Sequence, residues 1–560
     1  MRRAIATAAI FIVAHTSLSA EVSQLAGTSS INDIRTASRG VLLNRDIMTI
    51  SDMGNYSRGT SLNYGTARSM AMAGAMTSLG GDASSMFINP AGLGMAIDSD
   101  ITFTPLVTMQ SSDNSGGRYY DNDVTKFSIS NLSTTFNIYE SGTTKLVSLN
   151  FGLGYNRMAD LNYGYSLHSS ANASSIARLF SQQLTADQIN VYDLYGNDNP
   201  DWSTLPTDLW GAALGYKTGL TDTITSDTEW GATWISDDTS IDQYVAVESS
   251  GSIGEYDIAL GANVDNKLYL GFTLGIQSLY HHLDLLYGEE YSNPESFGSG
   301  LTSYDELHYM NYNQAVITRG IGVNVKLGAT YRLNDSFRVG VAYHSPTKYS
   351  LRREYQGSMA SCSTHYADGD KEVRYASADS PVLEDIEENE WIFRSPAKLM
   401  VGASMTLCKR ALLSVDYERM WCGSMRVKSA PTGVALSQYY NIGEIYQSVN
   451  TLRIGGEYKV TPQFALRGGY SFSSSMVGDG VSSADLLDMA TANKVSYYSA
   501  GVGYSPNRGI SLDLTYMRQS TEYTDSTIFY STSGGAAAQS GSYSTRLLRS
   551  NISLSLVLRM

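Results

Sequence analysis

Apolar and polar residues alternate strictly along several long segments of this chain. The segment KLYLGFTLGIQ, from Lys267, shows the pattern, and it returns from Gly320 to Tyr331 and from Asn551 to Met560. A period of two predicts extended strands with one apolar and one polar face. Strands of soluble β-sandwiches usually stop at about 5 to 6 residues, whereas a tilted membrane-spanning strand needs about 9 to 11. The length of the runs therefore favours membrane strands with one face toward lipid and the other toward a polar lumen.

The connections between the alternating runs are short and long in turn. Tight turns are predicted at Val264-Asp265-Asn266, Asn334-Asp335, Cys408-Lys409-Arg410, Thr461-Pro462 and Pro506-Asn507-Arg508-Gly509. Long polar segments separate these hairpins, and the longest runs from Ser166 to Ser249. An outer-membrane barrel has this layout, with short periplasmic turns and longer outside loops. We predict an all-β membrane protein, an antiparallel transmembrane β-barrel of about 14 strands over residues 100–560. A secreted array of β-sandwiches is the alternative.

The N-terminus has the layout of a secretory signal peptide. Residues 1–20 contain two arginines, an apolar run from Ala4 to Ala14, and small residues near Ser19 and Ala20. The mature protein is therefore expected to leave the cytoplasm and, as a barrel, to reside in the outer membrane of a Gram-negative bacterium. No later apolar run reaches the roughly 18 residues that a membrane-spanning helix needs, which excludes a helical membrane protein.

Small residues and methionine dominate the stretch before the first predicted strand, GTARSMAMAGAMTSLGGDASSMFINPAGLG, from Gly65 to Gly94. Small side chains allow close packing in a confined space, and methionine adapts to irregular gaps. We expect a helix from Thr66 to Leu79, a second turn capped by Asp82, and an Asn89 that Pro90 keeps out of helical conformation. Residues 21–99 are assigned to an N-terminal extension and a hatch that plugs the lumen.

The same stretch, followed by DITFTPLV, resembles the N-terminal hatch and first strand of the FadL-type outer-membrane transport family, which carries hydrophobic molecules such as long-chain fatty acids. The Asn-Pro-Ala signature of that family matches Asn89, Pro90 and Ala91. The resemblance runs from about Gly65 to the C-terminus, and beyond the hatch it rests on the strand layout. Two features depart from the family pattern: residues 21–63 form a longer polar lead than the hatch needs, and the chain ends in Met560 where an aromatic residue is usual.

The resemblance implies passive, ligand-driven uptake: capture at outer loops, passage into the lumen past the hatch, and sideways exit through a wall opening at a kinked third strand. Its partners would be a hydrophobic small molecule and the lipid and lipopolysaccharide of the outer membrane, and we expect a monomer. The alternative is a porin-like, structural or adhesive barrel without hydrophobic transport. The sequence does not rank fatty acids, aromatic hydrocarbons and other apolar compounds as ligands.

The third predicted strand, which starts at Leu146, contains a break in its apolar pattern. Its outward positions are apolar up to Tyr155 and again from Leu161, but the same phase would place Arg157 against lipid. An arginine at the bilayer midplane costs about 2 to 4 kcal/mol. We therefore predict a bulge or inward kink at this point, where the resemblance places the lateral opening. The segment consists of Asn156, Arg157, Met158, Ala159 and Asp160. The alternative is an intact strand whose arginine snorkels to the headgroups.

Apolar residues within the longest outer loop are candidates for substrate capture. They are Ile176, Leu179, Phe180 and Leu184, which have helical spacing, together with Trp202 and Trp210. Thr185 and Gln188 have the spacing of a capping box that would start a second helix. The alternative is that the apolar residues pack against each other as a small loop core.

Strand phase points charged side chains of both signs into the lumen. The basic ones are Lys326, Arg338, Arg453, Arg467 and Arg549, and the acidic ones include Asp416, Glu418, Glu457 and Asp513. An inward arginine suits a carboxylate ligand, because its guanidinium can bind both oxygens at once. Because both signs are present, the alternative is that most of these charges pair with each other or with the hatch.

Composition and motifs exclude several other classes of function. Loss of Arg2 and Arg3 with the signal takes the net charge from −15 to −17, which is not the footprint of a nucleic-acid-binding protein. The three cysteines contain no CxxC pair, and no histidine lies in an HExxH pattern. We therefore expect no enzymatic activity, no metal site and no cofactor.

Overall fold

The computed structural model describes residues 48–560 except residues 49, 60–63, 115–122, 173–174, 197–199, 236–238, 293, 295–302, 368–369, 384–388, 431–441, 479–491, 524–525, 528–529, 534–535, 540–541 and 544. The predicted signal peptide and residues 21–47 of the predicted N-terminal extension lie outside the described residues.

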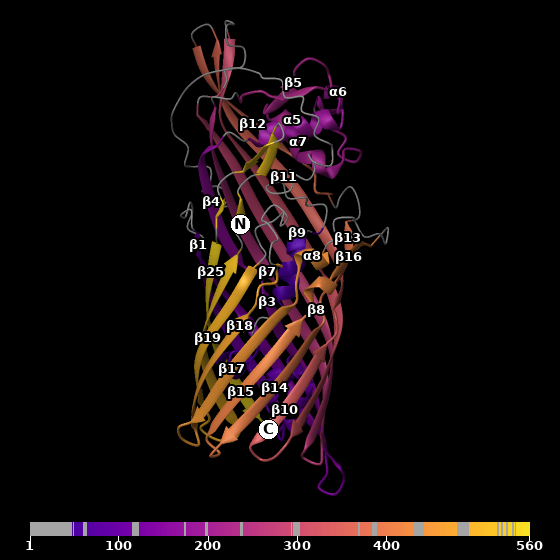
Figure 1. Cartoon of the computed structure of the whole chain (residues 1–560), viewed down its shortest axis with the longest axis vertical. Coiled ribbons are helices and arrows are strands. Elements are labelled where there is room, and N and C mark those ends of the chain that lie inside the picture. Colours follow the sequence, from indigo (N-terminus) through magenta and orange to yellow (C-terminus); the bar gives the residue numbers. More distant parts are fainter. Residues whose placement is uncertain are drawn as a thin grey trace.

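Fourteen antiparallel strands in the described part of the chain form a closed barrel, which confirms the predicted fold class (Figure 1). Each strand of this wall pairs with the next along the chain, and β25 pairs with β1 to close it. Closure matters in a membrane because lipid offers no hydrogen bonds to an exposed strand edge. The strands are β1 (Asp100–Asn114), β2 (Val124–Glu140), β3 (Leu146–Asp160), β7 (Ser240–Val264), β8 (Leu268–Ser292), β9 (Ser303–Arg332), β10 (Phe337–His344), β14 (Lys398–Leu407), β15 (Ala411–Met420), β17 (Val449–Lys459), β18 (Phe464–Ser473), β19 (Ala492–Tyr504), β20 (Ile510–Tyr523) and β25 (Thr545–Arg559).

The alternating pattern separates a lipid-facing from a lumen-facing surface. On β8, Leu270 and Phe272 are 43% and 42% exposed, whereas Thr273 and Gln277 are buried inside the barrel. The outward residues of β25, such as Leu554 at 44% exposure, follow the same rule. The apolar side chains thus form the outer band that contacts lipid.

All five predicted tight turns join consecutive wall strands at one end of the barrel. In the β7–β8 turn, Asp265 and Asn266 have φ angles of 55° and 54°, and in the β14–β15 turn Cys408 and Lys409 have φ angles of 50° and 55°. Two successive positive φ angles give the turn whose twist matches an antiparallel hairpin. Figure 1 places the C-terminus at this short-turn end, which is the periplasmic end in outer-membrane barrels.

At the opposite end, several strands continue far beyond the membrane. Strands β7 and β8 have 25 residues each and β9 has 30, whereas about 9 to 11 suffice to cross a bilayer. The outer half of β7 pairs with β4 (Tyr163–Asn172), and the outer half of β9 pairs with β11 (Lys348–Ala367). β11 in turn pairs with β12 (Asp370–Asp379) and β13 (Glu390–Arg394), and β13 pairs with β16 (Arg426–Ser429).

An outer subdomain packs against these extended strands (Figure 1). It consists of α5 (Ile176–Ala186), α6 (Val191–Leu194), η3 (Thr207–Leu209), α7 (Trp210–Lys217) and the hairpin of β5 (Thr221–Thr223) and β6 (Trp230–Ala232). The remaining elements are η5 (Cys422–Ser424), α8 (Ile442–Ile445) and two small hairpins, β21 (Ser526–Thr527) with β24 (Ser542–Tyr543) and β22 (Tyr530–Ser533) with β23 (Ala536–Gln539).

Inside the barrel lie the hatch and, before it, the helix α3 (Ile50–Gly59); both belong to the indigo segments of Figure 1. The hatch consists of α4 (Ala67–Ala71), η1 (Ala83–Met86) and η2 (Pro90–Met95). The side chains of Thr66, Asp82 and Asn89 cap these three helices. The cap predicted at Asp82 is present, and Asn89 has extended φ and ψ angles of −138° and 103°, as predicted for the residue before Pro90.

The helix predicted from Thr66 to Leu79 is shorter than expected. It ends at Ala71, and Ala73 and Gly74 follow in left-handed conformation with φ angles of 51° and 75°. Wall side chains replace the missing helical hydrogen bonds, since Ser499 Oγ donates to Ala71 O at 2.8 Å and Thr77 N donates to Asp416 Oδ2 at 2.7 Å. Long-range partners of this kind leave no periodic signal in the hatch sequence.

Candidate functional site

The hatch lies against wall positions that have no side chain. A Cβ atom at Gly271 would fall within 3.0 Å of the backbone of Pro90 and Ala91, and one at Gly455 would fall 2.6 Å from Met72 O. At Gly328 it would meet the side-chain oxygen of Asn89. Glycine is therefore required at these positions for the hatch backbone to approach the wall so closely.

The Asn89-Pro90-Ala91 signature forms a turn bonded to strand β9. Asn89 Nδ2 donates to Thr77 O at 2.5 Å and to Thr330 Oγ1 at 3.2 Å, while Asn89 Oδ1 accepts from Ala91 N at 3.1 Å. Asn89 is completely buried. One amide thus joins two parts of the hatch to the wall, in the place predicted for these three residues; their role in gating stays a prediction.

Wall hydroxyl and amide groups bond the rest of the hatch backbone. Ala67 N donates to Ser555 Oγ at 2.7 Å, Thr515 Oγ1 donates to Ala67 O at 2.6 Å, and Asn150 Nδ2 donates to Leu93 O at 2.7 Å. These residues lie on β25, β20 and β3. The hatch is therefore anchored around the lumen, and its buried backbone groups find partners on the wall.

The wall is interrupted beside the third strand. β3 pairs with β2 from Ser148 to Asn156, and no pairing between these two strands continues beyond Asn156 in the described residues. The opposite edge of β3 stays on β7, with a register shift between Arg157 and Ala159, and β4 then continues along β7. Residues 124–129 of β2 are left with β1 as their strand partner. We call this interruption the wall break; it confirms the predicted bulge.

A compact polar network stabilises the wall break. Asp160 Oδ1 accepts from Asn162 N at 2.9 Å and from Asn162 Nδ2 at 2.6 Å, and Asp160 Oδ2 lies 3.3 Å from Arg157 Nη2. Arg549 on β25 donates to Asn162 O at 2.7 Å and to Gln110 Oε1 at 2.8 Å. Arg157 is 8% exposed and faces this network, so the alternative in which it snorkels along an intact strand does not apply.

A buried cluster of packed apolar side chains adjoins the wall break inside the barrel. We call the space that these side chains fill the lumen chamber. Its walls include Met158 and Leu161 at the break, Leu279 on β8, Tyr349 on β11 and Phe393 on β13. An apolar surface therefore reaches from the interior of the barrel to the interruption in its wall.

Four of the five predicted basic lumen residues are paired with acidic groups. Lys326 contacts Glu255 and lies 3.0 Å from Asp257, Arg453 lies 3.1 Å from Glu418, Arg467 lies 2.7 Å from Glu457, and Arg549 lies 4.0 Å from Asp160. Arg338 Nη1 lies 3.6 Å from Met95 Sδ in the hatch, and no carboxylate of the described residues forms an ion pair with it. Pairing was the alternative that the sequence left open, and a ligand contact for these residues stays a prediction.

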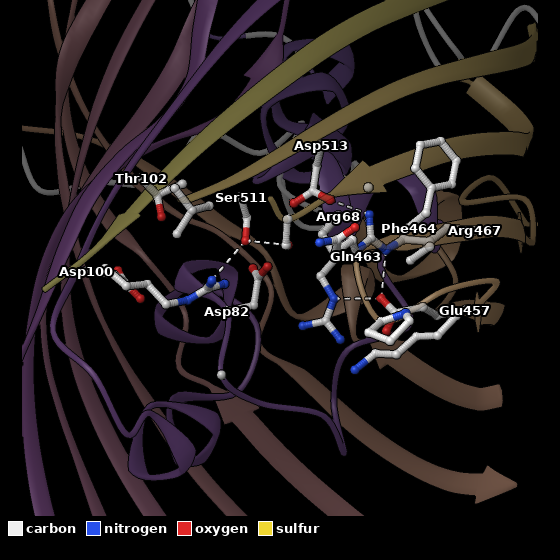
Figure 2. Close-up of a pocket in the computed structure, with 18 of the residues that line it drawn as sticks. Arg68, Asp82, Asp100, Thr102, Glu457, Gln463, Phe464, Arg467, Ser511 and Asp513 are labelled. Atoms are coloured by element: carbon white, nitrogen blue, oxygen red, sulfur yellow. Dashed lines mark hydrogen bonds and ion pairs between the residues drawn. The ribbon is translucent and has the colours of Figure 1, made fainter. Parts of the chain in front are cut away.

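A polar pocket of about 240 Å³ lies at the short-turn end between the hatch and the wall. Figure 2 shows Arg68 of the hatch, Glu457, Arg467 and Asp513 pointing toward one another there. Arg68 Nε donates to Glu457 Oε2 at 3.0 Å, and Arg467 Nη1 donates to Asp513 Oδ1 at 2.5 Å. An arginine is protonated at physiological pH in any case, and the carboxylate of Glu457 raises the pKa of Arg68 further. Arg68 is not among the predicted site residues, because its signal in the sequence is a single charge in a small-residue stretch.

The predicted capture residues form the core of the outer subdomain. Trp202 is partly buried, and the others are buried: Ile176, Leu179, Phe180, Leu184 and Trp210. They pack with residues of the extended strands, including Leu285, Tyr312 and Tyr355. This is the loop core that the sequence left open as an alternative. A role in capture stays a prediction, and burial argues against direct contact with substrate.

The capping box predicted at Thr185 and Gln188 is wrong. Thr185 lies in the last turn of α5, and Gln188 follows the helix with a φ angle of 54°. Helix α5 instead begins at Ser175, whose side chain accepts from Ala177 N. Buried Glu289 on β8 accepts hydrogen bonds from Ser175 Oγ at 2.6 Å and Ile176 N at 2.8 Å, a contact across 113 positions that no local motif reports.

Across the described ranges, no helix has the length and apolar character needed to span a membrane. The same residues contain no group of three or more His, Cys, Asp or Glu side chains arranged to hold a metal ion.

Residues 237–544, more than half of the chain, match the sequence family described as outer membrane protein transport protein (OMPP1/FadL/TodX). A FadL homologue of Pseudomonas aeruginosa has a similar structure, with a TM-score of 0.51 at 13% identity, covering 88% of this chain and 98% of that one. The toluene transporter TodX of P. putida gives a TM-score of 0.46 at 15% identity, covering 89% and 99%. The toluene transporter TbuX of Ralstonia pickettii gives 0.44 at 15% identity, covering 89% and 99%. No match to the sequence is found among curated proteins. With its family match and its closed barrel of fourteen strands, the chain belongs to the OMPP1/FadL/TodX family of outer membrane transport proteins.

Proposed function

We propose that this chain takes up hydrophobic small molecules passively and releases them sideways into the outer membrane through the wall break. The observation that carries the proposal is the end of β2–β3 pairing at Asn131 and Asn156, directly beside the lumen chamber. A molecule in that chamber would reach the membrane without crossing the hatch.

The route straight through the barrel suits an apolar molecule poorly. The hatch is bonded to the wall on several sides, and below it the short-turn end is lined by ion pairs such as Arg467 with Glu457. An apolar molecule there would deprive these charges of water and of each other, and unpaired charges in a low-dielectric site are costly. Exit through the side of the barrel is therefore favoured over passage straight through the short-turn end.

The wall break suits an apolar molecule better. Phe127 and Ile129, on the part of β2 that has no β3 partner, are 72% and 38% exposed. Met158 and Leu161, beside the break on β3 and directly after it, belong to the buried apolar cluster of the chamber. Exposed backbone groups in a membrane are tolerated only where protein or a cavity satisfies them. Here Arg549 donates a hydrogen bond to the carbonyl of Asn162, so this backbone group beside the break has a partner without a neighbouring strand.

A chemical block of the wall break tests the proposal. In a variant whose three native cysteines are replaced by serine, Lys126→Cys would be labelled with a bulky polyethylene-glycol maleimide. Lys126 is exposed on the part of β2 that lacks a β3 partner. Arg419→Cys is the matched control, because Arg419 is equally an exposed cation but lies on β15, which pairs on both sides.

We expect labelling at residue 126 to reduce uptake of a radiolabelled hydrocarbon or fatty acid at least several-fold, and labelling at residue 419 to leave it unchanged. Equal uptake by both labelled variants would contradict the proposed exit. Liposome swelling with sugars tests the alternative of a barrel without hydrophobic transport. Rapid entry of sugar would indicate a porin-like barrel. Entry of neither sugar nor apolar probe would indicate a structural or adhesive barrel.

A further inference from the structure

The helix α3 occupies the lumen chamber, although it precedes the hatch and belongs to the polar lead. Met53 and Tyr56 of α3 are completely buried and share the hydrophobic cluster of the chamber with Met158, Ala159 and Leu161. The chain therefore inserts its own side chains beside the wall break.

Three polar contacts join α3 to different parts of the wall. Asp52 Oδ2 lies 2.8 Å from Arg353 Nη1 on β11, with both side chains at most 5% exposed. Tyr56 Oη lies 3.0 Å from His281 Nδ1 on β8, and Ser57 Oγ donates to Met425 Sδ at 3.0 Å. These contacts fix the depth and rotation of α3 in the chamber.

One of these contacts continues to the wall break. His281 Nε2 lies 2.9 Å from Ser249 Oγ, and Ser249 Oγ donates to Leu161 O at 2.6 Å. Leu161 directly follows β3 and precedes the turn into β4. Tyr56 is thus connected through His281 and Ser249 to the backbone of Leu161 at the break, and its withdrawal would remove the first contact of this chain.

The sequence of α3 makes its docking reversible. ISDMGNYSRG contains two glycines, one asparagine and two serines among ten residues, and all three residue types are poor helix formers. A helix of this length is also marginally stable in water. Segments held by few contacts open locally at low free energy. The chamber holds α3 in helical form, and the helix is expected to unfold when it leaves.

We propose that α3 is a built-in occupant of the lumen chamber, which keeps the path to the wall break closed until an apolar ligand displaces it. The inference rests on the proposed function. The apolar part of the ligand takes the space of Met53 and Tyr56, and a ligand with a carboxylate also competes with Asp52 for Arg353.

A reversible disulfide tests the inference. In the cysteine-free background, Ser57→Cys and Met425→Cys place two thiols where the native side chains are in contact. Binding of the hydrophobic dye N-phenyl-1-naphthylamine to the purified full-length barrel in detergent, and uptake in cells, are measured before and after oxidation. Ser57→Cys alone, oxidised in the same way, is the matched control. Disulfide formation and heat-modifiable migration on gels report that α3 is docked and that the barrel is folded.

We expect oxidation to reduce dye binding and uptake at least several-fold in the double variant, reductant to restore both, and the single variant to be unaffected. Deletion of residues 48–59, or Asp52→Asn, is expected to increase dye binding. Undiminished dye binding by the locked barrel would overturn the inference.

The failures of the two proposals are distinguishable, because dye binding in detergent does not depend on the exit route. If the lock prevents dye binding while the maleimide at residue 126 leaves uptake intact, the lateral exit is wrong and the role of α3 stands. If the maleimide prevents uptake while the lock changes nothing, the exit stands and the role of α3 is wrong.

Discussion

At the scale of single residues, the absence of a side chain on the inner wall is as informative as the charges there. The polar face of β9 carries glycine at positions 320, 322 and 328 among larger residues, and Gly328 lies where the hatch turn at Asn89 makes contact. The sequence pattern identified an inward face at these positions. It did not reveal that the glycines admit a second backbone, because that depends on a hatch more than 200 residues away in the chain.

Gly328→Ala is expected to destabilise the seated hatch. The new Cβ would meet the Asn89 side chain and the backbone nitrogen of Ala91, and overpacking of this kind typically costs about 1 to 3 kcal/mol. Protease susceptibility of residues 65–94 in the folded barrel should rise. Gly142→Ala is the control, since a Cβ at Gly142 would have no neighbour within 4 Å. Equal hatch protection in both variants would contradict close packing at Gly328.

Asp160→Asn is expected to impair uptake by loosening the wall break. The substitution removes the charge that pairs with Arg157 and Arg549, and breaking a buried pair on one side typically costs about 3 to 5 kcal/mol. Glu418→Gln is the matched control, because it breaks a buried pair with Arg453 away from β3. Uptake per folded barrel should fall only for Asp160→Asn. If both substitutions reduced uptake equally, Asp160 would have no specific role in the exit of substrate.

At the scale of elements, the features that could be predicted from the sequence are those determined by residues close together in the chain. Asp265-Asn266 identified a hairpin turn, and an arginine in an apolar phase identified the bulge at Arg157, because both signals are local. The early end of α4, the outer halves of β7 to β9 and the burial of α3 depend on long-range packing. For that reason these features could not be predicted from local sequence patterns.

The outer subdomain is expected to fold and unfold separately from the wall. Phe180→Ser with Leu184→Ser removes two fully buried side chains, and truncation of a buried leucine or phenylalanine typically costs about 2 to 5 kcal/mol. Limited proteolysis should cleave between residues 175 and 235, while heat-modifiable migration shows an intact barrel. If the subdomain captures substrate, uptake at low substrate concentration falls as well. Unchanged uptake after cleavage of the outer subdomain would show that this subdomain does not capture substrate.

At the scale of the whole molecule, the barrel combines a hatch inside its lumen with a wall whose strand pairing is interrupted beside β3. The hatch is bonded to strands around the lumen, the short-turn end is lined by paired charges, and the wall break is bounded by apolar side chains. The barrel class and the position of the break were predictable, because repeated alternation and one misplaced arginine encode them. The ion-pair partners of the charged lumen residues were not predictable, because the register between the fourteen strands determines which side chains meet.

Photo-crosslinking of an apolar probe tests the central claim most directly. A diazirine-bearing hydrocarbon would be taken up by cells that carry the intact barrel and irradiated during transport, and the labelled residues would be identified by mass spectrometry. The account predicts labels at Met158 and Leu161 in the chamber and at Phe127 and Ile129 on the free part of β2. Labels at the short-turn pocket, around Phe464 and Arg467, with none on β2, would contradict it and show a route straight through the barrel.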